Sequence, residues 1–224
     1  MKNRKTIIYI CIVIMILIIA YLSYSIYKDI YGGNSKDVTV SDVVDLQKDY
    51  REAKAWIKIE GTSVNAPIFQ GMNNDKYLRN NRNGELTEWG ELFLDYRNDL
   101  NQMEDKANII VYGHNTEQDS YFSSLLKYEE KSFFDKNKII KFSTSEKTYE
   151  FEIFSVLKTN IDYYYIDTNF ESLQEYNLFV EDLKGKSIYD TGVIVESNDT
   201  ILTLSTCDYT TENGRFVVIG RLKK

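Results

Sequence analysis

The sequence predicts a mainly β domain, a barrel or a sandwich of about eight or nine short strands, behind an N-terminal membrane anchor. Short apolar or alternating runs bounded by turn residues recur from residue 55 to the end of the chain. Helical spacing is confined to one stretch before these runs and two stretches among them. At 224 residues the chain is long enough for one such domain and an appendage.

The N-terminus is predicted to be an uncleaved signal anchor. Three basic residues lie within residues 1–5, and residues 6–27 carry no charged side chain. About 20 apolar residues are needed to cross the hydrocarbon core of a bilayer. The positive-inside rule keeps residues 1–5 in the cytoplasm and places the domain on the extracellular face of a single-pass protein in the cell membrane. Residues 28–40, polar and Gly-containing, are predicted to be a linker.

The exported part is predicted to be acidic and to hold one cysteine. The formal net charge of the whole chain is −7, and three of its basic residues belong to the anchor. Nucleic-acid binding is therefore disfavoured, because it relies on clustered positive charge. Cys11 lies in the anchor and Cys207 in the domain, so a disulfide between them is implausible. A lone exported cysteine is either a free thiol or an intermolecular partner.

The strands are predicted from apolar runs that turn residues bound on both sides. In chain order they comprise residues 55–59, 63–69, 90–95, 107–113, 138–143, 147–158, 191–196, 200–207 and 215–222. Their number and shortness favour a barrel or a sandwich over a parallel sheet with crossover helices.

Helices are predicted in the remaining periodic stretches. Residues 41–53 place apolar side chains at roughly helical spacing ahead of the first strand. Residues 118–130 are predicted to form a second helix and residues 168–185 a stronger third one. In the third, we interpret Thr168 and Glu171 as a capping box at the start of the helix.

The residue inventory narrows the chemistry to a thiol. The chain has one histidine, His114, and no Gly-rich phosphate loop, so no metal or other cofactor is expected. What remains is nucleophilic catalysis by Cys207 with His114 as its proton partner. Both residues come where a strand runs out into a loop. Arg215 begins the next strand, and an antiparallel return would place this cation beside Cys207, where it can stabilise an oxyanion.

Sequence spacing alone leaves open that Cys207, His114 and Arg215 have purely structural roles. A lone buried cysteine is usually a small inert hydrophobe. A lone histidine is more often a satisfied loop residue than a catalyst, and an arginine at the start of a strand is usually solvated. Sequence spacing therefore gives a catalytic site about the same weight as a structural one.

At these residues the sequence resembles the sortases, membrane-anchored cysteine transpeptidases of Gram-positive bacteria. TLSTC at 203–207 matches the nucleophile motif, YGHN at 112–115 the histidine motif, and RFVV at 215–218 the strand that begins with the essential arginine. The resemblance extends over roughly residues 45–222. Within the family the chain is most similar to class B, whose members carry N-terminal helical structure and a long helix in the loop before the seventh strand.

The resemblance implies an eight-stranded sortase barrel over residues 41–224. It implies that Cys207 attacks the threonine carbonyl of a C-terminal sorting motif in an exported protein, that His114 protonates the departing amine, and that Arg215 holds the oxyanion or the substrate backbone. An amine of peptidoglycan then displaces the enzyme and anchors the protein to the cell wall. By motif position, the residues of the substrate groove are Asn74, Leu78, Tyr165, Ile166 and Ser205.

Two other functions remain as alternatives. A membrane-anchored cysteine peptidase would use the same thiol and pass the acyl group to water. A surface module without catalysis would merely pack Cys207, and the thiol would then resist reagents. Product analysis with and without an added amine separates the first alternative from a transpeptidase.

Overall fold

The computed structural model describes residues 13–23, 37–103, 107–116 and 119–224. The chain falls into two compact units, Met1–Asp37 and Val38–Lys224. In the first unit residues 13–23 are helical and their side chains are exposed, and the rest of the predicted anchor lies outside the described residues. No helix of the described part is both long enough and apolar enough to span a bilayer.

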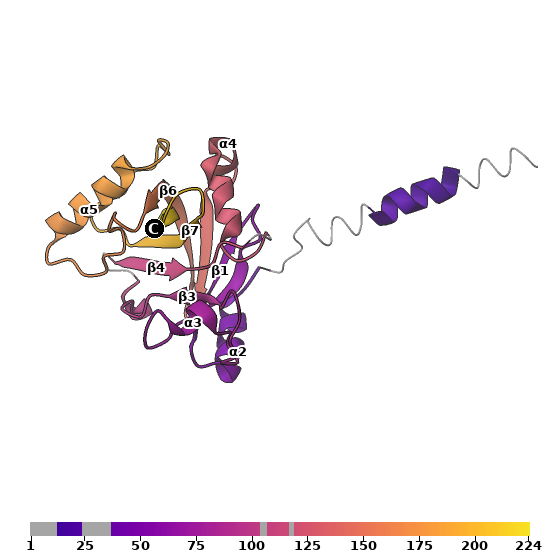
Figure 1. The fold of residues 1–224 in the computed structure, drawn as a ribbon, viewed down its shortest axis with the longest axis horizontal. Helices are drawn as coiled ribbons and strands as arrows, with labels where there is room; N and C mark the ends of the chain where they lie inside the picture. The colour runs from indigo at the N-terminus through magenta and orange to yellow at the C-terminus, as the bar shows by residue number, and fades with distance from the viewer. Residues whose placement is uncertain (1–12, 24–36, 104–106, 117–118) are drawn as a thin grey trace, which may run out of the picture. The chain divides into compact units, whose positions relative to one another are not determined.

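The second unit is a closed barrel of eight strands in the order β1-β2-β3-β4-β7-β8-β6-β5 (Figure 1). The strands are β1 (Ala53–Ile59), β2 (Asn65–Phe69), β3 (Leu92–Leu94), β4 (Asn108–Tyr112), β5 (Ile139–Thr144), β6 (Thr148–Asn160), β7 (Ile201–Asp208) and β8 (Gly214–Leu222). The predicted mainly β fold is confirmed, and closure of the sheet selects the barrel over the sandwich. Closure also removes the exposed strand edges that an open sheet would present.

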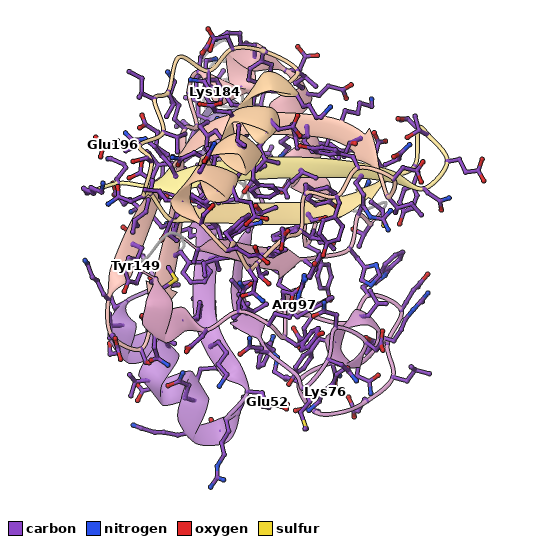
Figure 2. All side chains as sticks on the ribbon, turned by 90° about the vertical axis from the view of Figure 1, so that its left-hand side faces the viewer. Glu52, Lys76, Arg97, Tyr149, Lys184 and Glu196 are labelled. Carbon is purple, nitrogen blue, oxygen red and sulfur yellow. The ribbon has the colours of Figure 1, made fainter. Side chains whose placement is uncertain are left out.

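The helices lie outside the barrel. They are α2 (Val40–Asp49), α3 (Lys76–Arg79), α4 (Lys131–Phe134) and α5 (Leu173–Gly185), with 3-10 turns η1 (Leu100–Gln102) and η2 (Ser123–Glu129). Both views place α5 at one end of the domain and α2 at the other (Figures 1 and 2). The helix in the loop between β6 and β7 is therefore present, as the resemblance implies.

Two apolar layers position these elements. The barrel interior is filled by buried side chains such as Ile57, Phe142 and Leu204, each worth about 1.5–3 kcal/mol on burial. A second cluster lies between the barrel and α5, where Tyr176 and Leu183 are fully buried. The long helix is thus fixed to the outer face of the strands that form the C-terminal half of the barrel.

The predicted strand over residues 191–196 is wrong. The segment has no ladder partner; instead Val193 packs into the cluster beneath α5, and its carbonyl accepts a bond from Lys184 Nζ at 2.9 Å. The short apolar run here provides one contact with a helix. A short apolar run cannot distinguish that contact from pairing in a sheet.

Two of the predicted helices also differ from the prediction. Helix α5 begins at Leu173, and Ser172 is its N-cap, with Oγ accepting the backbone N–H of Glu175 at 3.1 Å. The proposed box of Thr168 and Glu171 lies in the preceding loop and is wrong. The stretch 118–130 contains a 3-10 turn over Ser123–Glu129 rather than an α-helix.

Candidate active site

The ends of three adjacent strands meet at one edge of the barrel. Strand β4 runs parallel to β7 as far as the pair Tyr112 and Ser205. Strand β8 returns antiparallel, and Cys207 pairs directly with Arg215. Because His114 and Cys207 each lie two residues beyond the last parallel pair, the topology brings them to neighbouring positions. The predicted return of the arginine beside the cysteine is confirmed.

Side chains extend the β4–β7 pairing past the end of the ladder. Thr206 donates its Oγ1 proton to the carbonyl of Gly113 at 2.7 Å. Asn115 donates from Nδ2 to the carbonyl of Cys207 at 2.9 Å. His114 is therefore held between two cross-strand hydrogen bonds, and its backbone cannot move away from Cys207 without breaking one of them.

Gly113 is required by the packing beneath the histidine. A Cβ atom there would lie 2.4 Å from Leu92 Cδ2 and 2.8 Å from the ring of Phe122. No larger residue fits without displacing the core, which is close-packed. The backbone that leaves β4 therefore packs directly against the side chains of Leu92 and Phe122, and this contact fixes the position of the His114 backbone.

The histidine ring is oriented by a backbone carbonyl. His114 Nε2 lies 2.8 Å from the carbonyl oxygen of Leu78 in α3, and the rings of Trp89 and His114 meet edge to face, with centroids 5.9 Å apart. A carbonyl only accepts, so the neutral ring carries its proton on Nε2. Nδ1 is then the nitrogen that can accept a proton.

The thiol and the guanidinium are both available for chemistry. Cys207 is a free, half-buried cysteine. Arg215 donates from Nη1 to the carbonyl of Gly214 at 2.8 Å, and no acidic partner of it occurs in the described part of the chain. A cation that lacks a fixed counter-charge beside a thiol suits an anion that forms there.

All three side chains open on one pocket of about 240 Å³. Of the predicted groove residues, Leu78, Tyr165, Ile166 and Ser205 line this pocket together with His114, Cys207 and Arg215. Nothing in the sequence pattern marks the remaining lining residues as part of a groove; they are Phe93, Tyr112, Gly113, Ile161, Tyr163, Tyr164 and Thr206. Their aromatic and aliphatic character suits an apolar peptide side chain.

Asn74 lies behind the pocket and is not one of its lining residues. Its Nδ2 donates to Asp95 Oδ2 at 3.0 Å, and its Oδ1 accepts the backbone N–H of Tyr96 at 3.0 Å. Both polar ends of the side chain are therefore committed to the segment that follows β3. Motif position does not show where a side chain points.

Tyr165 and Ser205 form a polar pair in the pocket floor. The Tyr165 hydroxyl lies 2.8 Å from Ser205 Oγ, and both residues are buried. Burial raises the pKa of the phenol, although the bond to Ser205 and the charge of Arg215 act in the opposite direction. The phenol stays neutral and holds Ser205 two residues ahead of Cys207.

A thiol, an imidazole and a guanidinium at adjacent strand ends, all facing one apolar groove, define an enzyme of the cysteine acyl-transfer class. Among the described residues no cluster of three or more potential ligands could hold a metal ion. The fold and the site thus describe a barrel enzyme that acts through a thiol.

Comparison with known proteins identifies the family. The Sortase domain model matches residues 57–223. The chain is 37% identical over 197 residues to Sortase B of Listeria monocytogenes, covering 87% of this chain and 79% of that protein. The Staphylococcus aureus sortase B–substrate complex superposes with a TM-score of 0.77 at 35% identity, covering 84% of this chain and 87% of that one.

A sortase B structure complexed with triglycine superposes equally well, with a TM-score of 0.77 at 36% identity over 84% of this chain and 88% of that one. The chain belongs to the sortase family of cysteine transpeptidases, and the relatives that it matches are class B sortases.

Proposed function

We propose that this chain joins exported proteins to the cell wall, by cleaving a C-terminal sorting motif after threonine and transferring the new carboxyl end to a peptidoglycan amine. The observation that carries the proposal is the meeting of His114, Cys207 and Arg215 at three adjacent strand ends that face one pocket. Family membership supports the same reaction.

In the first step the Cys207 thiolate attacks the threonine carbonyl carbon. The C–S bond forms as the carbonyl electrons move onto oxygen, and Arg215, across the ladder from Cys207, stabilises that oxyanion. Collapse of the intermediate expels the downstream amine. A thioester to Cys207 remains, which is the covalent intermediate expected of nucleophilic catalysis by a thiol.

His114 carries the proton through both steps. The imidazolium gives a proton to the departing amine, and the neutral ring later takes one from the incoming amine as the C–N bond forms and the thioester breaks. The Leu78 carbonyl occupies Nε2, so Nδ1 is the nitrogen that exchanges this proton. The ring thus ends each turnover in the state in which it began.

The pocket supports a peptide substrate and an amine acceptor. Its walls carry Leu78, Tyr164 and Ile166, which offer apolar contacts to residues upstream of the threonine. One structural relative is a substrate complex of a sortase B, and another is complexed with triglycine. By analogy, the groove holds the sorting peptide and the amine approaches the thioester from its open side.

We also propose that residues 6–27 anchor the enzyme in the cell membrane, with residues 1–5 in the cytoplasm and the barrel on the extracellular face. The support is the uncharged apolar run behind three basic residues. An anchored enzyme meets its exported substrates at the surface where they emerge.

A product assay tests the proposed reaction. The full chain in detergent micelles is incubated with a library of fluorogenic pentapeptides that contain threonine, with triglycine or a diamino acid as acceptor, and Cys207→Ala alongside. We expect cleavage and an amine-linked product from the wild type and neither from the variant. Hydrolysed product alone at every amine concentration would favour the peptidase.

A further inference from the structure

The groove wall is a segment without regular structure, and side chains of the barrel hold it. We use the term groove wall for residues 163–167, which lie between β6 and α5. The carbonyls of Tyr165 and Asp167 accept from Asn108 Nδ2 at 3.3 and 2.9 Å, and the carbonyl of Ile166 between them accepts from Arg97 Nη2 at 2.9 Å. Three consecutive carbonyls thus turn toward the barrel, which aims the Tyr165 and Ile166 side chains into the pocket.

Arg97 reaches the groove wall because Asp95 holds its guanidinium. Nε donates to Asp95 Oδ1 at 2.8 Å and Nη2 donates to Oδ2 at 2.9 Å. The third nitrogen, Nη1, donates to the Tyr164 hydroxyl at 3.4 Å. A fork held at two points has one orientation, so the remaining contacts to the groove wall are fixed in direction.

Asp95 is itself fully buried and fixed by the residues around it. Asn74 Nδ2 and the Tyr112 hydroxyl both donate to its Oδ2, at 3.0 and 2.9 Å. Burial alone would raise the pKa of this carboxyl, but the bonds from Arg97, Asn74 and Tyr112 outweigh it and the net pKa is lowered. The pair is charged, and the commitment of Asn74 is explained by this contact.

We infer that Arg97, oriented by Asp95, is a positioning residue that fixes the groove wall and thereby sets how tightly and how selectively the groove holds a peptide. Figure 2 shows the Arg97 side chain beneath the β7 and β8 strands, on the side of the domain that carries Lys76. The inference rests on the proposed function only in assuming that the peptide in this groove is the sorting motif.

Arg97 is set apart from the reacting groups. Its guanidinium contacts Asp95, Tyr164 and Ile166, and it does not line the pocket. Its loss should therefore change the KM for the peptide and leave the chemistry at Cys207 intact. A residue needed only for folding would lower the apparent kcat through the fraction of active enzyme and leave KM unchanged.

The first test needs no substrate. Chymotrypsin cuts after tyrosine, and residues 163–165 of the groove wall are all tyrosines, so cleavage there reports opening of the groove wall. We compare the full chain with Arg97→Gln, Arg97→Lys and the control Arg221→Gln, mapping the cuts by mass spectrometry. Arg221 is a matched control: its side chain is 23% exposed, and its guanidinium donates to Glu152 at 2.9 Å, away from the groove.

We expect cleavage at 163–165 to be about tenfold faster in Arg97→Gln, the size of one lost charge-assisted hydrogen bond, and unchanged in Arg221→Gln. Arg97→Lys keeps the charge but loses the fork and should lie between them. Equal cleavage in Arg97→Gln and the wild type would overturn the inference. This outcome does not depend on whether the chain has the proposed activity.

The second test is kinetic and uses the pentapeptide that the wild type cleaves best. We expect Arg97→Gln to raise KM about tenfold while kcat changes less than about twofold, and to discriminate less between pentapeptides that differ upstream of threonine. Alkylation of Cys207 by iodoacetamide should keep its wild-type rate and pH profile. A loss confined to kcat, or an altered alkylation profile, would refute the positioning role.

A double variant separates the groove wall from general stability. If Arg97 acts through Ile166, then Arg97→Gln should add little to the KM of Ile166→Ala, so the two changes should be less than additive. Additive effects would mean that Arg97 acts elsewhere. Should Arg97→Gln fold poorly by its thermal midpoint, the same cycle is run with Arg97→Lys.

Discussion

Two ends of the barrel each carry a cavity and a set of charged residues, and they differ in how those charges are used. The far end, near the starts of β6 and β7 and the end of β8, has a cavity of about 480 Å³, twice that beside Cys207. Its charges are paired: Lys224 lies 3.0 Å from Asp199 and Lys223 lies 2.9 Å from Glu150. In Figure 2, Tyr149 and Glu196 mark this side and Arg97 the other.

The catalytic edge has the smaller cavity, and its reactive and charged groups have fewer fixed partners. Cys207 has a free thiol, and Arg215 donates only to the backbone of its own loop among the described residues. Volume alone would select the far end. The comparison teaches that an active site is identified by reactive groups that have a fixed position but no neutralising partner. A larger polar cavity can simply be the surface of an ion-pair network.

The largest effect should come from removing the thiol. Cys207→Ala is expected to lower peptide cleavage by at least about a thousandfold, because the covalent route is lost. The thermal midpoint should change little, since the side chain is small and half-buried. Fluorogenic cleavage and calorimetry measure the two quantities. Substantial activity in the variant would show that the catalytic edge is no more reactive than the far end.

The next effect should come from the arginine. Arg215→Lys keeps the charge but not the geometry of the guanidinium, and we expect about a hundredfold loss in kcat/KM. The rate of Cys207 alkylation by iodoacetamide should fall far less, because alkylation forms no oxyanion. Arg221→Lys at the far end is the control and should keep wild-type kcat/KM. Equal losses in the two variants would erase the distinction between the ends.

At the far end the expected effect is on stability. Asp199 is 1% exposed, accepts the backbone N–H of Glu196 at 2.9 Å and lies beside Lys224 and Arg221. Asp199→Ala should lower the free energy of unfolding by about 2 kcal/mol, because a buried hydrogen-bonded charge is lost. Denaturant titration measures it, with the exposed neighbour Asn198→Ala as control. The active-site kinetics should survive; a matching loss of kcat would contradict the separation.

The smallest effect should be on the stability of the protein at acidic pH. The folded-state pKa of Asp95 is lowered against an unfolded value of about 3.9, so its contribution to stability is complete above that pH and is lost as pH falls through the folded pKa. Below about pH 4 the wild type should lose stability, with a smaller slope in Asp95→Asn than in the exposed control Asp162→Asn. Urea titrations across this range measure the slopes, and identical slopes would contradict the assignment.

The local sequence pattern was enough to predict which strand ends carry the catalytic residues. Strands β4, β7 and β8 are long apolar runs with clear boundaries, so the positions of His114 and Cys207 at strand ends could be predicted, and an antiparallel return placed Arg215. The wrong strand at 191–196 had the same local pattern. Val193 and Val195 pack into the cluster beneath α5, and a contact between distant segments leaves no local signature.

The groove wall was the least predictable part of the site. Asp95 and Arg97 stand in a polar stretch after β3, where charged residues are usually solvated, and nothing in their spacing indicates that Asp95 is fully buried. Their partners Asn74, Tyr164 and Ile166 come from segments far away in the chain. Burial and direction of a side chain arise from packing across those segments, and only the folded barrel specifies them.

The parallel pairing of β4 with β7 has a consequence for the order of folding. Its first pair joins Asn108 to Ile201 across 93 positions of the chain. Such distant contacts form late, because the entropy of closing a long loop is lost before any contact forms. Until β7 docks, β4 presents a bare edge open to pairing with another chain. The thiol and imidazole therefore become neighbours only when the barrel closes, so folding intermediates carry no partial active site.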